Sequence, residues 1–329
     1  MRKEIESNPE DISSIARRNK TEPEKLRRAY RNNLSEFREF HKTHREFFKK
    51  EAFVFPENIG PNMGIDETTL RDGEFYTILC NKDRKGKKGS LAAIIKGTKA
   101  SRVVGSIDQH ASVTQKFSIK EMSLDLSSGM DWIVREIAPN AIKTYDRFHV
   151  ERLITEAVQQ VRIKYRWEAI SKENKIKKEK ELQRLKTYRN GDTEKQLLAR
   201  SRLLLYKRPS QWSPQQRERA KILFEEFPLI KKAYYLYIEF KEGYSLNRLQ
   251  AEHHFNDWIK KVKRSQIDQL ITAAETIRKR LGGILNYLEN KSTNASVENF
   301  NRKLKELLSR VRGINNKEIF FYRLIQLYA

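Results

Sequence analysis

Cysteine is nearly absent from this chain of 329 residues. The one cysteine, Cys80, excludes an internal disulfide and any zinc site built from several cysteines. Long apolar runs are also absent: no stretch approaches about 18 consecutive apolar residues, and the first residues, MRKEIESNPEDISS, contain no hydrophobic signal core. We therefore expect a protein without a membrane segment that stays in the reducing cytoplasm.

Acidic residues are few compared with basic ones. The chain has 67 Lys and Arg against 43 Asp and Glu, a formal net charge of +24. An excess of this size repels itself in the folded state and is most often relieved by a polyanion, so nucleic acid is the expected partner. Residues 151–210 hold 17 basic and 8 acidic side chains, although any one of these charges could simply belong to a solvated helix face.

Residues 1–50 predict a short helical N-terminal arm. Pro23 stands at the first turn of a probable helix, where its missing N–H costs nothing. The two helices around Thr21 could form a helix-turn-helix that contacts DNA, or an amphipathic pair that packs on its own chain. The segment FVFPENIGPN contains two prolines, and two glycines, Gly60 and Gly64, stand ahead of Asp66. The segment is interpreted as the linker that ends the arm.

Residues 60–150 predict a sheet with helical crossovers. Short apolar runs bounded by Gly, Asn, Asp or Lys are typical of buried strands, and here they are MGID, EFYTILCN, GSLAAIIKG, FSIKEMSLDL and AIKTYD. Helices are expected around 98–111 and in MDWIVREIAP. The order is three strands with short connections, then a helix, a strand, a helix and a strand, which indicates an α/β arrangement. GKKGS at 86–90 is interpreted as a basic turn because it lacks phosphate-loop spacing.

Residues 151–290 carry helical spacing with long polar faces and almost no strand signal, so they predict an all-helical domain. In the C-terminal segment 291–329, Asn294 is a plausible N-cap for a helix that runs to Gly313. Its buried stripe is expected to be Val297, Phe300, Leu304, Leu307, Leu308 and Val311.

Three carboxylates come from these separate segments. Asp66 lies in the strand-like MGID, Asp125 alternates with apolar residues in EMSLDL, and Glu298 stands in the first turn of the C-terminal helix. Carboxylates brought together repel each other, and Mg²⁺ removes that repulsion. Each also has a simpler explanation, because Asp often caps a turn after a strand and a first-turn Glu complements the helix dipole.

The motifs GIDE, LDLSSGM, PNAIKTYDRFHVERL, NGDTEKQLLARSRLLL and STNASVENFNRKLKELLSRVRG, in this order, resemble the DDE transposases of bacterial insertion sequences, in the ISL-three-like group. The resemblance runs from about residue 52 to the C-terminus. It implies an α/β, RNase H-like mixed-sheet core in two parts, 60–150 and 291–329, separated by a helical insertion at 151–290. It also implies a cytoplasmic, nucleoid-associated protein.

The resemblance further implies a site. Asp66, Asp125 and Glu298 correspond to the metal ligands of the family, which hold two Mg²⁺ or Mn²⁺ ions. Asp146 competes with Asp125 for the middle position, or orients substrate together with His149. The ions then serve Mg²⁺-dependent cleavage of element ends and strand transfer to target DNA.

DNA phosphates are expected to be contacted by basic side chains near these motifs, namely Arg147, Arg302, Lys303, Lys305, Arg310 and Arg312. Because a transposase must hold two element ends, a homodimer or larger assembly on DNA is expected. Two alternatives stay open: a catalytically inactive DNA-binding descendant, and a nuclease of the same fold without strand transfer.

Overall fold

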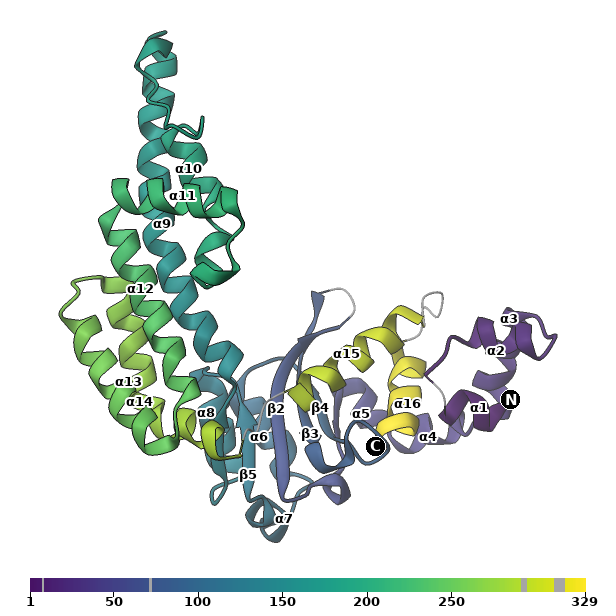
Figure 1. Cartoon of the computed structure of the whole chain (residues 1–329). Coiled ribbons are helices and arrows are strands. Elements are labelled where there is room, and N and C mark those ends of the chain that lie inside the picture. The colour runs from purple at the N-terminus through teal and green to yellow at the C-terminus, as the bar shows by residue number, and fades with distance from the viewer. Residues whose placement is uncertain (8, 71–72, 291–294, 311–316) are drawn as a thin grey trace. The chain divides into compact units, whose positions relative to one another are not determined.

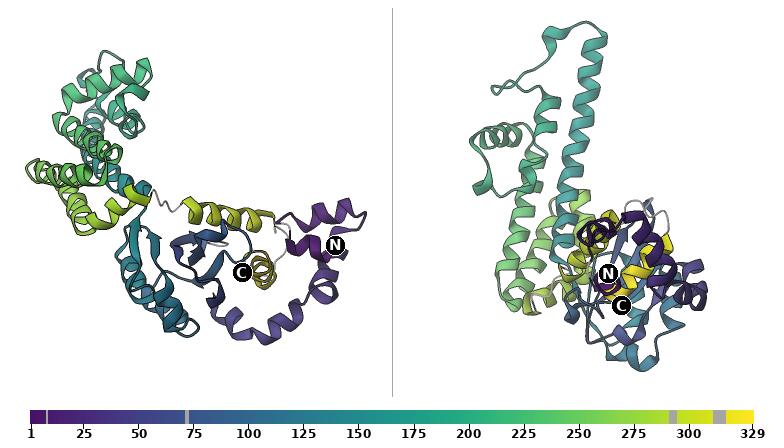
Figure 2. Two further views of the ribbon diagram at one scale, coloured as in Figure 1. Left: turned by 60° about the horizontal axis from the view of Figure 1, so that its bottom comes forward. Right: turned by 90° about the vertical axis from the view of Figure 1, so that its right-hand side faces the viewer.

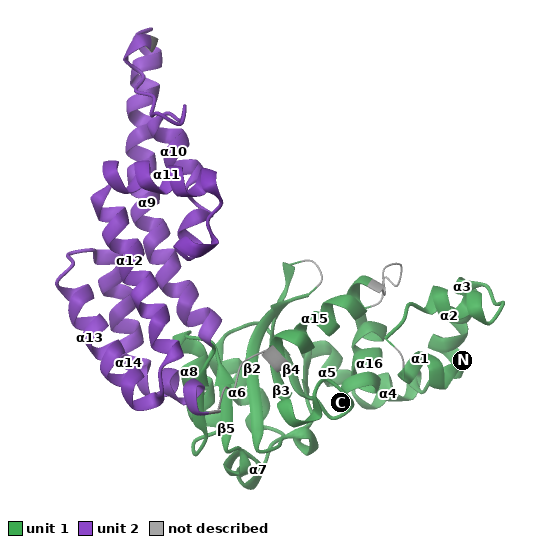
Figure 3. Ribbon diagram, viewed as in Figure 1, with its two compact units in different colours: residues 1–146, 292–329 green, residues 147–291 purple. Residues whose placement is uncertain are grey.

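The structure is a computed structural model that describes residues 1–329 except 8, 71–72, 291–294 and 311–316. The described residues form two compact units, and the chain passes from the first to the second and back (Figure 3). Unit 1 contains residues 1–146 and 292–329, and unit 2 contains residues 147–291.

A six-stranded mixed sheet forms the centre of unit 1, with the strand order β1-β4-β3-β2-β5-β6 (Figure 1). β2 pairs antiparallel with β3 and parallel with β5, and β5 pairs parallel with β6. The predicted order of strands and helices and the α/β class are therefore found. The strands are β1 (Ala52–Val54), β2 (Asn62–Thr69), β3 (Phe75–Asn81), β4 (Leu91–Lys96), β5 (Glu121–Leu124) and β6 (Ile142–Tyr145).

The predicted linker at 53–62 is corrected at its start. Phe53 and Val54 belong to β1, which pairs antiparallel with β4 at the sheet edge, and their side chains are buried. Pro56 and the two glycines that followed suggested a linker, but the apolar Phe53 and Val54 gain more by packing on the sheet. Pro56 itself begins a 3₁₀ turn, Pro56–Asn58, just beyond the strand.

Helices cover both faces of the sheet. The connections between β4, β5 and β6 supply α6 (Ala100–Asp108), α7 (Val113–Ser118) and α8 (Ser128–Ile137). α15 (Ala295–Arg310) packs on β2, and α16 (Lys317–Tyr328) follows it. Of the predicted stripe on α15, the first four side chains are buried, Leu308 is partly buried, and Val311 lies outside the described residues. Asn294, the expected N-cap, also lies outside them.

The N-terminal helices pack into the same core as α16, so the two ends of the chain lie side by side (Figures 1 and 2). Arg323 of α16 is almost fully buried and donates hydrogen bonds to the carbonyl oxygens of Ile5 (3.3 Å) and Glu10 (2.9 Å). The helical elements of this segment are α1 (Arg2–Ser7), α2 (Ile12–Arg18), α3 (Pro23–Ala29), a π-helical turn (Tyr30–Leu34), α4 (Phe37–Thr43) and α5 (Arg45–Lys50).

Unit 2 consists of helices and the loops that join them in the part that the structure describes, apart from an isolated bridge between Thr187 and Thr193. Asp192 is fully buried there and pairs with Arg200 and with Arg219 (2.9 Å), which holds the segment before α10 against α11. The α-helices are α9 (Arg147–Lys178), α10 (Glu194–Arg200), α11 (Pro214–Glu226), α12 (Pro228–Glu242), α13 (Arg248–Lys263) and α14 (Asp268–Asn290). Among the described helices of the chain, none combines the length and the apolar character that crossing a bilayer requires.

Candidate active site

Asp66 lies on the central strand of the sheet. Along β2, side chains alternate between faces, so Asp66 shares a face with Gly64 and Thr68. Its Oδ1 accepts a hydrogen bond from the backbone N–H of Glu67 (2.8 Å), and its Oδ2 accepts one from Nδ2 of Asn301 on α15 (2.8 Å). The helix that packs on this face therefore holds the Asp66 carboxylate from a residue 235 positions away.

Glu298 stands in the first turn of α15, with its side chain exposed. Val297 and Phe300 on either side are fully buried, so they fix the helix on the sheet and turn Glu298 outward. Asn301 follows Glu298 by three residues, and residues three apart lie on one helix face. Glu298 and the Asn301–Asp66 hydrogen bond therefore come from the same side of α15.

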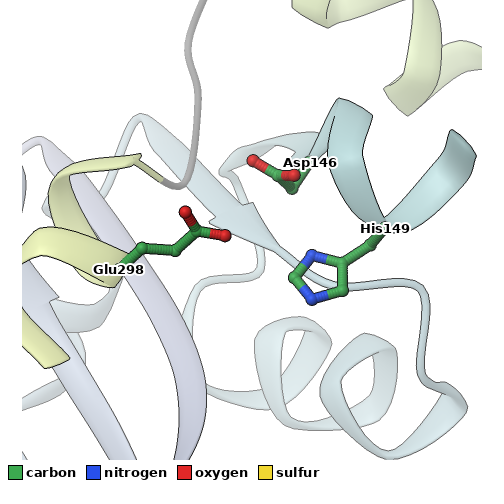
Figure 4. Close-up of side chains that lie close together, drawn as sticks. All are labelled: Asp146, His149 and Glu298. Carbon is green, nitrogen blue, oxygen red and sulfur yellow. The ribbon is translucent and has the colours of Figure 1, made fainter. Parts of the chain in front are cut away.

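Asp146, His149 and Glu298 come together (Figure 4). Each offers one possible ligand atom, and these atoms all lie within 4.8 Å of one another. Asp146 is buried directly after β6, and His149 follows it by three residues in the first turn of α9. Figure 4 shows the carboxylate of Glu298 extending from α15 toward the other two side chains.

Asp125 directly follows β5, the strand between β2 and β6. The last pair of the β5–β6 ladder is Leu124 with Tyr145, so Asp125 and Asp146 leave neighbouring parallel strands at the same edge. The Oδ1 of Asp125 accepts a hydrogen bond from the backbone N–H of Ser127 (2.8 Å), which begins α8. Asp125 is thus at this edge of the sheet but outside the Asp146–His149–Glu298 group.

The electrostatics of this edge are those of crowded carboxylates. Burial, together with the nearby charges of Asp125 and Asp66, raises the pKa of the Glu67 carboxyl above its usual value. Carboxylate oxygens and an imidazole nitrogen are suitable ligands for Mg²⁺ or Mn²⁺, and a cation there relieves the repulsion between the acids. The residues present therefore fit a divalent metal.

The basic side chains expected to contact DNA differ in the partners that they already have within the protein. Arg147 pairs with Glu151 (2.7 Å) and lies over the ring of Tyr244, so it is tied within unit 2. Arg302 is exposed but pairs with Glu306 (3.3 Å), whereas Lys305 is exposed on α15. Lys303 donates to the carbonyl oxygen of Gly86 (2.9 Å). Arg312 and the side chain of Arg310 lie outside the described residues.

Sequence reasoning missed Asn301 and Glu67. The spacing of Asn301 three residues after Glu298 was a usable signal, since it places a polar amide on the face that carries the catalytic candidate. Asn301 is 6% exposed, and its Oδ1 is buried without a hydrogen-bond partner among the described residues. Nothing in the sequence marked Glu67, because its importance comes only from the carboxylates placed around it.

Comparisons with known proteins bear on the identity of this site. The model of a transposase family, the DDE transposases of the ISL3 type, matches residues 63–324. A curated relative, the transposase for insertion sequence element IS1001 of Bordetella parapertussis, is 24% identical over 208 residues, which cover 63% of this chain and 47% of that protein. The chain thus spans about half the length of this relative. No solved structure matches. The family match contains Asp66, Asp125, Asp146 and Glu298 and most of the chain, so this chain belongs to the ISL3 family of DDE transposases.

Proposed function

We propose that the chain is a DNA transposase that cuts the ends of an insertion sequence and joins them to target DNA at the site containing Asp66 and Glu298. The observation that carries the proposal is the meeting of Asp146 and Glu298, from segments 152 residues apart in the chain, while Asp66 is bound to the same helix through Asn301. Carboxylates gathered in this way repel each other, and a bound cation would relieve that repulsion. The family match supports the reaction class.

We also propose that the sheet of unit 1 is an RNase H-like core and that unit 2 is an insertion in it. Three features support this proposal. β2, β3 and β4 are antiparallel neighbours, β5 and β6 are added parallel to β2 through helical crossovers, and unit 2 begins directly after Asp146 and ends before α15. The N-terminal helices then pack beside this core, through the apolar cluster that they share with α16.

Asp66, Asp125 and Glu298 are the residues proposed to hold two Mg²⁺ or Mn²⁺ ions. Bound there, the ions supply charge stabilisation for the attacking and leaving oxygens of a phosphodiester. The protein's part is to hold its side chains in place. Asn301 orients Asp66, Val297 and Phe300 anchor the turn that carries Glu298, and Asp146 lies beside Glu298.

Two residues compete for the middle ligand position. Asp125 follows the strand next to β2, and its bond to Ser127 engages Oδ1 and leaves Oδ2 for a ligand. Asp146 belongs to the group with Glu298. We propose that Asp125 binds the ions and that Asp146, with His149, positions Glu298 and substrate. The two candidates for the middle ligand differ in which variant, D125A or D146A, should lose cleavage.

DNA is the proposed substrate and partner, because the chain carries a net charge of +24 and its family acts in transposition. Cleavage of two element ends in one reaction requires that both be held together, so the proposed active form is a homodimer or larger assembly on DNA.

The test is strand cleavage of duplexes taken from the genomic DNA that flanks the coding region, with Mg²⁺ present. The substitutions D66A, D125A and E298Q should each reduce cleavage by at least about 10³-fold, since charge stabilisation at a reacting phosphate is a large part of such catalysis. Binding of the same duplexes should stay close to that of the unsubstituted protein. Mn²⁺ binding, followed by electron paramagnetic resonance, should weaken in all three variants.

The outcomes separate the alternatives. Cleavage by D125A together with none by D146A would transfer the middle ligand role to Asp146. Cleavage without joining to a target duplex would identify a nuclease. An inactive DNA-binding descendant would show two results together. The unsubstituted chain would not cleave, and it would bind Mn²⁺ as weakly as the E298Q variant does.

A further inference from the structure

A cavity of about 910 Å³ in unit 1 is lined by residues from segments far apart in the sequence, and its charged side chains are four lysines and two glutamates. α1, the turn between β3 and β4, α15 and α16 all contribute to it. Its charged lining residues are Lys3, Lys87, Lys88, Lys303, Glu6 and Glu306. The cavity lies outside the carboxylate group, since none of those carboxylates lines it.

The positive charge of this cavity is not neutralised by its own acids. Glu6 pairs with Arg2 (3.1 Å), and Glu306 pairs with Arg302 (3.3 Å). Both acids are thus already engaged by arginines that do not line the cavity. Lys3, Lys87 and Lys88 are exposed and form no ion pair with any residue that the structure describes. Gathered ammonium groups without acidic partners repel each other and are stabilised by a bound anion.

The turn that carries Lys87 and Lys88 is held in a fixed conformation. Gly86 and Gly89 have φ angles of +71° and +83°, which glycine adopts without strain. Lys303 reaches across from α15 to the carbonyl oxygen of Gly86 (2.9 Å), and Asn62 of β2 donates to Asp83 at the start of the turn (2.9 Å). The two lysines are therefore presented by an anchored turn, which reduces the entropy lost when they bind a ligand.

α15 connects this cavity to the candidate active site. Lys303 lies five residues after Glu298, a rise of about 7.5 Å along the helix axis, and five residues also turn the helix by about 140°, so the two side chains leave different faces of α15. The cavity and the candidate active site therefore each receive side chains from the same helix.

We propose that this basic cavity binds the sugar-phosphate backbone of the duplex DNA on which the candidate active site acts. The assignment of DNA as the anion rests on the proposed transposase function. The lysines contact phosphates and no base is read there, so this surface contributes affinity and position without sequence preference.

The experiment measures duplex binding by fluorescence anisotropy at several salt concentrations, with EDTA present so that no cleavage occurs. The double substitution K87A/K88A should lower the magnitude of the slope of log affinity against log salt by about 1.8, because each lost phosphate contact removes about 0.9. The reduction should be the same for duplexes of unrelated sequence. Circular dichroism checks that the variant is folded.

The matched control is K99A/K120A, which removes two exposed lysines of unit 1 that lie outside the cavity and form no ion pair with a described residue. Its salt slope should stay within about 0.3 of the unsubstituted value, well below the change expected for two lost phosphate contacts. Equal slopes for K87A/K88A and the unsubstituted chain, or equal losses in both double variants, would overturn the proposal. Because binding is measured without metal, this result is independent of whether D66A or E298Q abolishes cleavage.

Discussion

At the scale of single residues, Asn301 is the side chain whose role is most sharply defined by its contacts. Its Nδ2 holds Oδ2 of Asp66, and the amide is almost completely buried. A partner that orients a metal ligand affects metal affinity or activity by about 10 to 100-fold. With Asp66 as a metal ligand, as proposed above, Asn301 is a positioning residue that acts through Asp66.

We predict that N301A lowers Mg²⁺-dependent cleavage by about 10 to 100-fold and raises the Mg²⁺ concentration needed for half-maximal rate. Duplex affinity in EDTA should not change. The measurement is the cleavage rate across a Mg²⁺ titration, with N299A as control, since Asn299 is exposed and bonds to Arg302. A purely structural role would instead lower the rate equally at all Mg²⁺ concentrations.

The sequence alone identified the candidate carboxylates because their types and motifs are local. The partnership between Asp66 and Asn301 spans 235 positions, and only the packing of α15 on β2 creates it. The sequence favoured Asp125 over Asp146 as the middle ligand, and that choice stays a prediction. Both follow strands directly, and the difference depends on where the side chains point after the strands end.

At the scale of elements, α16 packs against the N-terminal helices and holds them by hydrogen bonds. Arg323 binds the backbone carbonyl oxygens of Ile5 and Glu10, so α1 and the start of α2 depend on it. The strands and most helices of the sheet were predicted correctly because their apolar periods are clear. β1 was mistaken for a linker because three residues carry too little pattern to outweigh the prolines that follow.

We predict that R323M loosens α1 and α2 and lowers the free energy of unfolding by about 3 kcal/mol, because hydrogen bonds from a charged donor are worth about 1.5 to 3 kcal/mol each. Hydrogen exchange should show faster amide exchange in residues 2–18 and little change in unit 2. R18M is the control, since Arg18 forms exposed pairs with Glu4 and Glu10. Equal exchange in R323M and unsubstituted protein would show that α1 is held by apolar packing alone.

At the scale of the whole molecule, a charged cluster joins the sheet to α16 and makes unit 1 sensitive to acid. Hydrogen bonds from Lys317 and Lys96 lower the pKa of Glu74 to about 2. A carboxyl whose folded pKa is depressed contributes stability above its unfolded pKa, and this contribution disappears as pH falls through the folded value. For Glu74 the loss should occur between pH 4.5, its ordinary value, and about 2.

We predict that E74Q unfolds at a lower urea concentration than the unsubstituted protein at pH 6, and that the difference shrinks steadily below pH 4.5. Urea unfolding followed by circular dichroism across this range measures it. E252Q removes the same charge from an exposed residue of unit 2 that has no ion pair among the described residues, and it should show no such trend. A difference for E74Q that is constant from pH 6 to 3 would contradict the prediction.

The discontinuity of unit 1 has a consequence for synthesis of the protein. Phe53, Tyr76 and Ile78 are buried against helices that a ribosome makes only after all of unit 2. At about 5 to 20 residues per second, this apolar face waits on the order of ten seconds for α15 and α16, and apolar surface exposed during folding promotes aggregation. Glu298 is also made only after all of unit 2, so the cleavage proposed above has to wait for it.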